Sequence, residues 1–172
     1  MRALARGDRI RRFMQALADA AREDVRVYFT GGATAVLSGW RDSTIDVDLK
    51  LVPELDALLR AIPALKESLE LNVELASPAD FIPVLPGWED RSPFIHRLGR
   101  VSFHHFDLYA QALSKVERGH AQDAADVREL LQRGLVDRRR ALDYFRNIEP
   151  ELYRFPAIDP PAFRRAVEHA FG

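Results

Sequence analysis

The chain has 172 residues, a formal net charge of −1 and no cysteine. Its hydrophobic and charged fractions, 47% and 30%, are those of an ordinary soluble globular protein with one hydrophobic core. The lack of cysteine excludes disulfides and thiolate zinc sites, and the balanced charge excludes a global attraction to nucleic acid or membranes. No apolar run is long enough to cross a bilayer, and none follows the basic N-terminal segment 1–12. A cytoplasmic protein without a membrane partner is therefore expected.

The first part of the chain is predicted to alternate helices with strands. Helical spacing of apolar residues, period-two alternation and Gly or Pro punctuation mark the boundaries. The predicted elements are a helix over 8–22, a strand over 25–30, a helix over 33–37, a strand over 44–52, a helix over 54–62 and a strand over 69–76. Gly39 is expected to end the second helix, and Pro63 to break the third.

The second part begins with an irregular segment, 77–93, which contains four prolines and is predicted to be a loop. A hairpin over 94–106 with its turn at Gly99 follows, and the chain is then predicted to be helical to its end. Asp107 is well placed to cap the first of these helices. The expected class is α/β (α+β), a mixed sheet flanked by helices. The expected domains are a core over 1–106 and a helical region over 107–172 packed on it.

Two carboxylates stand close together on the strand over 44–52. Asp46 and Asp48 point to the same face because strand side chains alternate, and they repel each other unless a cation or proton lies between them. Gly31 and Gly32, between a strand and a helix, have backbone N–H groups that an anion can approach without a Cβ in the way. A phosphate cradle beside a pair of metal ligands predicts a nucleotide site.

These residues carry a resemblance to a known family. Gly31-Gly32, a gap of thirteen residues and then Asp46-Val47-Asp48-Leu49 resemble the signature of the DNA polymerase β-like nucleotidyltransferase superfamily. Arg41 and Thr44 complete a run, R-x-x-T-x-D-x-D, that is similar to one in its small bacterial members. Among these, the chain most resembles the nucleotidyltransferase-like proteins related to AbiEii-type toxins of toxin–antitoxin pairs. A weaker likeness extends to about residue 131.

The resemblance implies roles for individual residues. Asp46 and Asp48 would be catalytic and would bind Mg²⁺ or Mn²⁺, with Glu74 as the third carboxylate; alternatively, Glu74 simply belongs to the polar face of its strand. Asp80 and Asp107 are the reserves for that third position. The nucleotide would contact Gly31, Gly32, Arg41, Thr44, Lys115 and Asp123, with Asp126 as an alternative to Asp123. From the residues alone, Arg41 serves equally well to fix its loop, and Lys115, Asp123 and Asp126 are plain surface charges.

The expected activity is metal-dependent transfer of NMP from an NTP to an unknown acceptor: an RNA such as tRNA, a protein or a small molecule. An antitoxin partner would follow if the chain is a toxin. A second hypothesis is a catalytically weakened module that binds a nucleotide or a partner protein. A metal-dependent phosphohydrolase ranks third. His104 and His105 are adjacent on one strand, so they face opposite ways and cannot chelate one metal; a surface or hydrogen-bonded role is expected for both.

Overall fold

The computed structural model describes residues 3–172, and the first two residues of the N-terminal segment discussed above lie outside the described part. The chain forms two compact units. The sheet unit comprises Met1–Ser77 and Ser92–Phe106, and the helical unit comprises Pro78–Arg91 and Asp107–Gly172. The expected mixed α/β class with a helical C-terminal region is confirmed.

The sheet unit is built on a five-stranded mixed sheet with the order β5-β4-β2-β7-β6. Its strands are β2 (Val25–Thr30), β4 (Asp46–Val52), β5 (Asn72–Leu75), β6 (Phe94–Leu98) and β7 (Val101–His105). β2 pairs antiparallel with β4 and parallel with β7, and β5 pairs parallel with β4. A separate two-stranded ladder joins β1 (Ala5–Arg6) to β3 (Ser43–Thr44). The predicted hairpin is confirmed as β6–β7, with Gly99 at a positive φ in its turn.

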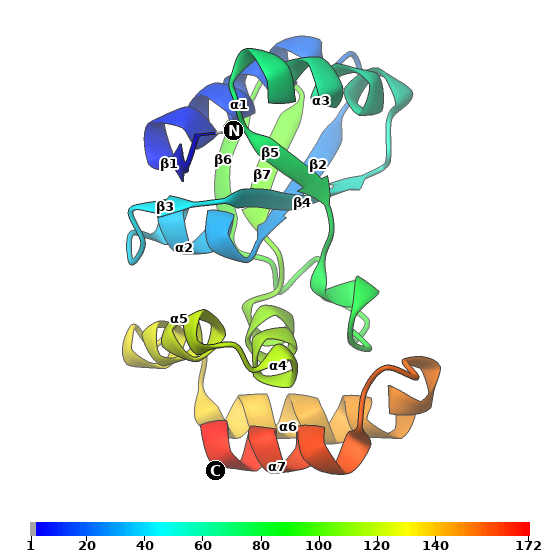
Figure 1. The fold of residues 1–172 in the computed structure, drawn as a ribbon. Coiled ribbons are helices and arrows are strands. Elements are labelled where there is room, and N and C mark those ends of the chain that lie inside the picture. Colours follow the sequence, from blue (N-terminus) through cyan, green and yellow to red (C-terminus); the bar gives the residue numbers. More distant parts are fainter. Residues whose placement is uncertain (1–2) are drawn as a thin grey trace. The chain divides into compact units, whose positions relative to one another are not determined.

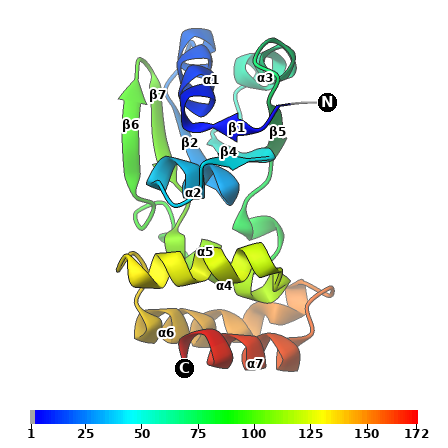
Figure 2. The same cartoon turned by 60° about the vertical axis from the view of Figure 1, so that its left-hand side comes forward.

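Three helices belong to this unit: α1 (Gly7–Ala20), α2 (Gly32–Ser38) and α3 (Asp56–Ser68). α1 and α3 lie side by side (Figures 1 and 2). Their apolar stripes join one hydrophobic cluster with alternate residues of the strands, which include Val27, Phe29, Val47, Leu49 and Phe103. The polar residues between these positions, Asp46 and Asp48 among them, therefore point to the opposite face of the sheet.

Most element boundaries differ from the predictions by one or two residues, and three differences stand out. The strand predicted over 44–52 is interrupted at Ile45, which is 71% exposed. The strand predicted over 69–76 begins only at Asn72, because Glu70 has a φ of 52° and so leaves the extended region. The prediction that Pro63 breaks its helix is wrong, since α3 continues through it to Ser68. Pro63 lies at an exposed position, where water can satisfy the carbonyl that loses its N–H partner.

The helical unit contains a short 3₁₀ turn and four α-helices, with a second 3₁₀ segment before the last. Its elements are η1 (Pro78–Asp80), α4 (Leu108–Arg118), α5 (Ala121–Gln132), α6 (Arg138–Ile148), η2 (Glu149–Arg154) and α7 (Pro160–Phe171). α6 and α7 run antiparallel beside each other (Figure 1). Phe145 and Phe163 meet edge to face between them, with ring centroids 5.0 Å apart.

Asp107 ties the irregular segment 78–91 to these helices. Its carboxylate accepts from the N–H of Tyr109 at 3.0 Å, which confirms the predicted helix cap, and pairs with Nε of Arg91 at 2.8 Å. The rest of the Arg91 guanidinium donates to the carbonyls of Leu85 and Pro86. This segment therefore groups with the helices, whereas the expected core over 1–106 included it.

Candidate functional site

The glycine turn between β2 and α2 lies against the acidic strand. Gly31 has φ 60° and ψ −130°, a combination that is accessible to glycine but strained for other residues. A Cβ added at Gly31 would lie 3.4 Å from Oδ2 of Asp48, and one at Gly32 would collide with the hydroxyl of Thr44. The positive φ therefore favours glycine at position 31, and the close approach of Thr44 requires it at position 32.

Arg41 and Thr44 lie at the same turn. Nη1 of Arg41 is 3.4 Å from the position that a Cβ at Gly32 would take. The Thr44 hydroxyl donates to the backbone carbonyl of Asp46 at 3.0 Å, which fastens the loop to the start of β4. The sheet unit thus brings Gly31, Gly32, Arg41, Thr44, Asp46 and Asp48 together at one end of the β2–β4 pair.

The register of β5 places Glu74 next to this acidic pair. Asp48 stands opposite Glu74 and Asp46 opposite Asn72 in the parallel ladder, so all four side chains share one face of the sheet. The Asn72 amide donates to the carboxylate of Asp46, and its nitrogen lies 3.5 Å from Oε1 of Glu74. Glu74 is exposed, whereas Asp46 and Asp48 are half-buried.

The chemistry of these donors suits a hard divalent cation, because carboxylate oxygens are the ligands that Mg²⁺ prefers. Asp46 and Asp48 share one face, and the side chain that bonds to the Asp46 carboxylate is a neutral amide, which brings no positive charge of its own. Within residues 3–172, however, no three His, Cys, Asp or Glu side chains are gathered closely enough to hold a metal ion. The pair fits a cation, and Glu74 as its third ligand stays a prediction.

Sequence reasoning missed two residues on this face. Asn72 was assigned to a polar strand face but not to the site, although it holds Asp46. Lys50 lies two residues beyond Asp48 on the same strand, opposite Tyr28 of β2. Period-two alternation in D-V-D-L-K already put Lys50 on the face of the aspartates. Nothing in the sequence could place Asn72, because its contact depends on the β4–β5 register.

Lys115 and Asp123 belong to the helical unit. Lys115 is 6% exposed, and its Nζ lies 2.8 Å from Oδ2 of Asp126 and 3.8 Å from Oδ1 of Asp123. Asp123 in turn receives two hydrogen bonds from Arg118. The interpretation of Lys115, Asp123 and Asp126 as plain surface charges is wrong, since all three are buried.

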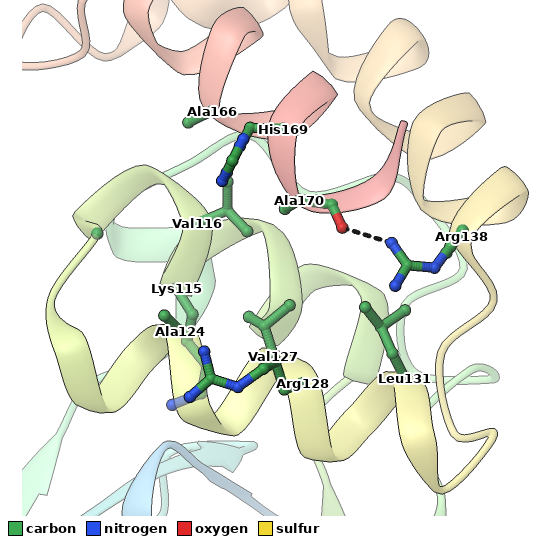
Figure 3. Close-up of a pocket in the computed structure, with 11 residues that line it drawn as sticks. Lys115, Val116, Ala124, Val127, Arg128, Leu131, Arg138, Ala166, His169 and Ala170 are labelled. Carbon is green, nitrogen blue, oxygen red and sulfur yellow. Dashed lines mark hydrogen bonds between the residues drawn. The ribbon is translucent and has the colours of Figure 1, made fainter.

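The pKa of Asp123 reflects this arrangement. Burial alone would raise the pKa of its carboxyl, but the hydrogen bonds and charge of Arg118, with the charge of Lys115, outweigh burial and lower it. Lys115 also lines a pocket of about 410 Å³ between α4, α5, α6 and α7 (Figure 3). At one end of that pocket Arg138 donates to the carbonyl of Ala170 at 2.8 Å. None of the residues that line it is a predicted metal ligand.

The two reserve carboxylates also lie in the helical unit. Asp80 is exposed in η1, and Asp107 is fully buried and engaged by Arg91 and the start of α4. A carboxylate that pairs with a guanidinium and accepts from a backbone N–H already has its charge and its oxygens engaged. It is therefore a poor ligand for a metal ion. Glu74 is therefore a better candidate for the third carboxylate than Asp107.

The adjacent histidines face opposite sides of the sheet, as expected. His104 stacks on Tyr28, with ring centroids 5.1 Å apart. His105 points to α2, where Nδ1 lies 3.1 Å from the Thr34 hydroxyl and Nε2 lies 3.5 Å from that of Ser38. Burial, with a smaller contribution from His104, lowers the pKa of His105 to about 4, so its ring is neutral near pH 7.

Comparison with known proteins identifies the family of this chain. The chain matches a family described as "Nucleotidyltransferase of unknown function (DUF6036)" over residues 8–144, which is most of its length. No curated protein and no solved structure matches it. None of the helices within residues 3–172 is both long and apolar enough to cross a lipid bilayer. The chain belongs to the nucleotidyltransferase family of unknown function (DUF6036).

Proposed function

We propose that the protein is a metal-dependent nucleotidyltransferase that transfers NMP from an NTP to an acceptor. One observation carries the proposal: the glycine turn approaches Asp48 so closely that a Cβ at Gly31 would touch its carboxylate. A glycine turn that lies against an acidic pair suits a triphosphate that is bridged to the protein by cations.

Each residue of the site in the sheet unit has its own proposed role. The N–H groups of the Gly31–Gly32 turn and the guanidinium of Arg41 bind the phosphates, since a guanidinium and backbone N–H groups both donate to phosphate oxygens. Thr44 keeps the loop in place through the carbonyl of Asp46, and Asn72 orients the Asp46 carboxylate. Lys50 supplies a positive charge on the face that these acids occupy.

Asp46 and Asp48, with Glu74, would hold Mg²⁺ or Mn²⁺, and the metal would acidify the acceptor hydroxyl and neutralise charge on the leaving pyrophosphate. We leave Lys115 and Asp123 out of the proposed site. The ammonium of Lys115 already pairs with Asp126, and removing it from that buried pair would leave a carboxylate desolvated without its cation.

The decisive experiment uses Asp46→Asn, which keeps the side-chain volume and removes the charge. Wild-type protein and variant are incubated with each labelled NTP, Mg²⁺ or Mn²⁺, total RNA and cell lysate. We expect the variant to lose all labelling while its circular dichroism spectrum stays unchanged. Asp56→Asn, at an exposed position in the first turn of α3, is the matched control and should label normally. Equal labelling by wild type and Asp46→Asn would refute the proposed function.

The same reaction identifies the acceptor, which we propose is an RNA, a protein or a small molecule. Labelled product that nuclease destroys is RNA, product that protease destroys is protein, and product that resists both and passes a small-pore filter is a small molecule. A toxin role, with an antitoxin partner, predicts that expression stops growth in the wild type and not in Asp46→Asn.

A second candidate is a binding module with a weakened site. It is favoured by the absence, within residues 3–172, of a gathered three-carboxylate metal cluster, and by the hydrogen bond that already engages Asp46. Calorimetry with Mg²⁺ and each NTP separates the two candidates. Tight binding of an NTP with no labelled product under any acceptor condition supports the module, and multiple turnover supports the enzyme.

A further inference from the structure

His105 connects the sheet to the helix that follows the glycine turn. It is the last residue of β7 and pairs in register with Phe29 of β2, two residues before Gly31. Its ring reaches Thr34 and Ser38, which stand one turn apart on α2. One side chain therefore contacts both turns of this short helix.

The hydrogen bonds determine which ring nitrogen carries the proton. Thr34 donates its only hydroxyl proton to the carbonyl of Phe29, at 3.3 Å. In the arrangement that satisfies both contacts of Thr34, its oxygen accepts from Nδ1 of His105, and the ring proton lies on Nδ1. Nε2 is left bare and accepts from the Ser38 hydroxyl at 3.5 Å, the longest contact of the three. The chain of donors runs from Ser38 through His105 and Thr34 to the backbone of β2.

The glycine turn depends on where α2 sits. α2 has only seven residues, and a helix of two turns has little stability of its own. Its Ala33, Ala35 and Val36 are buried, so it also packs against the rest of the sheet unit. The contacts of His105 with Thr34 and Ser38 add a directional constraint to this packing. α2 begins at Gly32, so its first residues adjoin the turn that approaches Asp48.

We propose that His105 is a positioning residue for the nucleotide site: through Thr34 and Ser38 it holds α2 in place and so sets the Gly31–Gly32 turn against Asp48. This inference rests on the proposed function for its consequence in nucleotide binding. His105 is not a catalytic residue, because its ring points to α2 and away from the face that carries Asp46 and Asp48.

Three substitutions test the role in binding. His105→Leu removes both ring nitrogens, and we expect it to weaken binding of Mg²⁺–NTP at least tenfold by calorimetry. His105→Asn retains an N–H donor near the position of Nδ1, so it should bind within threefold of wild type. His96→Leu, an exposed histidine on β6 of the same unit, is the control and should bind as wild type does.

A double-mutant cycle with Thr34→Val separates the hydrogen bond from general packing. Valine keeps the shape of threonine and removes the hydroxyl that accepts from His105. We expect Thr34→Val and His105→Leu to weaken binding by similar factors and the double variant by no more than either alone. Independent, multiplicative losses would overturn the coupling that the proposal requires.

Hydrogen exchange of the peptide that covers residues 30–38 gives a readout without nucleotide. We expect faster exchange in His105→Leu, wild-type exchange in His105→Asn, and no change in α1 in either variant. If the wild type binds no NTP but this peptide exchanges faster in His105→Leu, the proposed function is wrong. The role of His105 in holding α2 in place is then still supported. Unchanged exchange, or wild-type nucleotide affinity in a folded His105→Leu, overturns the inference.

Discussion

The two units of this protein treat their carboxylates in opposite ways. In the helical unit Asp107, Asp123 and Asp126 are at most 1% exposed, and each pairs with its own cation, Arg91, Arg118 and Lys115 respectively. In the sheet unit Asp46 is half-buried and bonded to a neutral amide, and Glu74 beside it is exposed.

The difference shows how acidic residues with a structural task can be told from those available for binding. A fully desolvated carboxylate must be neutralised within the fold, because an isolated buried charge costs several kcal/mol. A half-buried carboxylate with a neutral donor keeps its charge and can still attract a cation from solution. Asp123 and Asp126 are therefore part of the scaffold, and Asp46 is a candidate ligand.

The largest effect is expected from breaking the buried pair of the helical unit. Asp126→Asn should lower the free energy of unfolding by about 3–5 kcal/mol, because Lys115 keeps its charge and loses its nearest partner. Urea denaturation measures the change. The double variant Lys115→Met/Asp126→Leu should recover most of the loss, since apolar side chains need no partner.

The same double variant tests whether Lys115 serves the nucleotide. We expect it to retain NTP-dependent labelling. Loss of labelling in a folded double variant would show that Lys115 does serve the nucleotide. It would then contradict the contrast between the two units.

The next effect concerns pH and His105. Its folded-state pKa of about 4 lies below the ordinary 6.5, so between these values the unfolded chain binds the extra proton. The free energy of unfolding should therefore fall as the pH falls from 6.5 to about 4, by roughly 3 kcal/mol in total. α2 carries no ionisable residue, and Asp123, whose pKa is lowered, loses its contribution only below about its ordinary 3.8.

His105→Asn should remove the largest part of this dependence and leave the part that belongs to His104, whose pKa is also lowered by burial. Urea denaturation of wild type and variant at pH 6.5 and 4.5 checks it. A slope as steep in the variant as in the wild type would show that His105 is not its main source.

A smaller effect is expected at the glycine turn. Gly31→Ala places a Cβ 3.4 Å from the Asp48 carboxylate and strains a positive φ, so transfer should fall about 100-fold, which corresponds to about 2.7 kcal/mol. Gly39→Ala is the matched control: its φ is also positive, at 96°, but nothing lies within 4 Å of the added Cβ. It should lose stability and keep the transfer rate. Equal transfer rates in Gly31→Ala and Gly39→Ala would show that the turn at Gly31 is not part of the site.

The smallest effect belongs to an exposed ion pair of the helical unit. Arg146 and Asp143 lie 3.0 Å apart, but their side chains are 72% and 53% exposed. Arg146→Ala should change the free energy of unfolding by less than about 1 kcal/mol, because water screens the pair. A loss comparable with that of Asp126→Asn would show that burial does not set the value of these pairs.

Most local elements and the signature could be predicted from the sequence alone. Alternation and glycine placement located β2, the turn at Gly31 and the shared face of Asp46 and Asp48, because these depend on neighbours within a few residues. The helix cap at Asp107 was predictable for the same reason.

Contacts between residues far apart in the chain could not be predicted and are known only from the fold. The contact of Asn72 with Asp46 follows from the register of β5 on β4, and the bridge from His105 to Thr34 joins residues 71 positions apart. The burial of Lys115 with Asp126 depends on how helices pack, which helical spacing of charges cannot reveal. Local patterns specify the direction of a side chain, whereas its partner and its solvent exposure are set by packing between segments far apart in the chain.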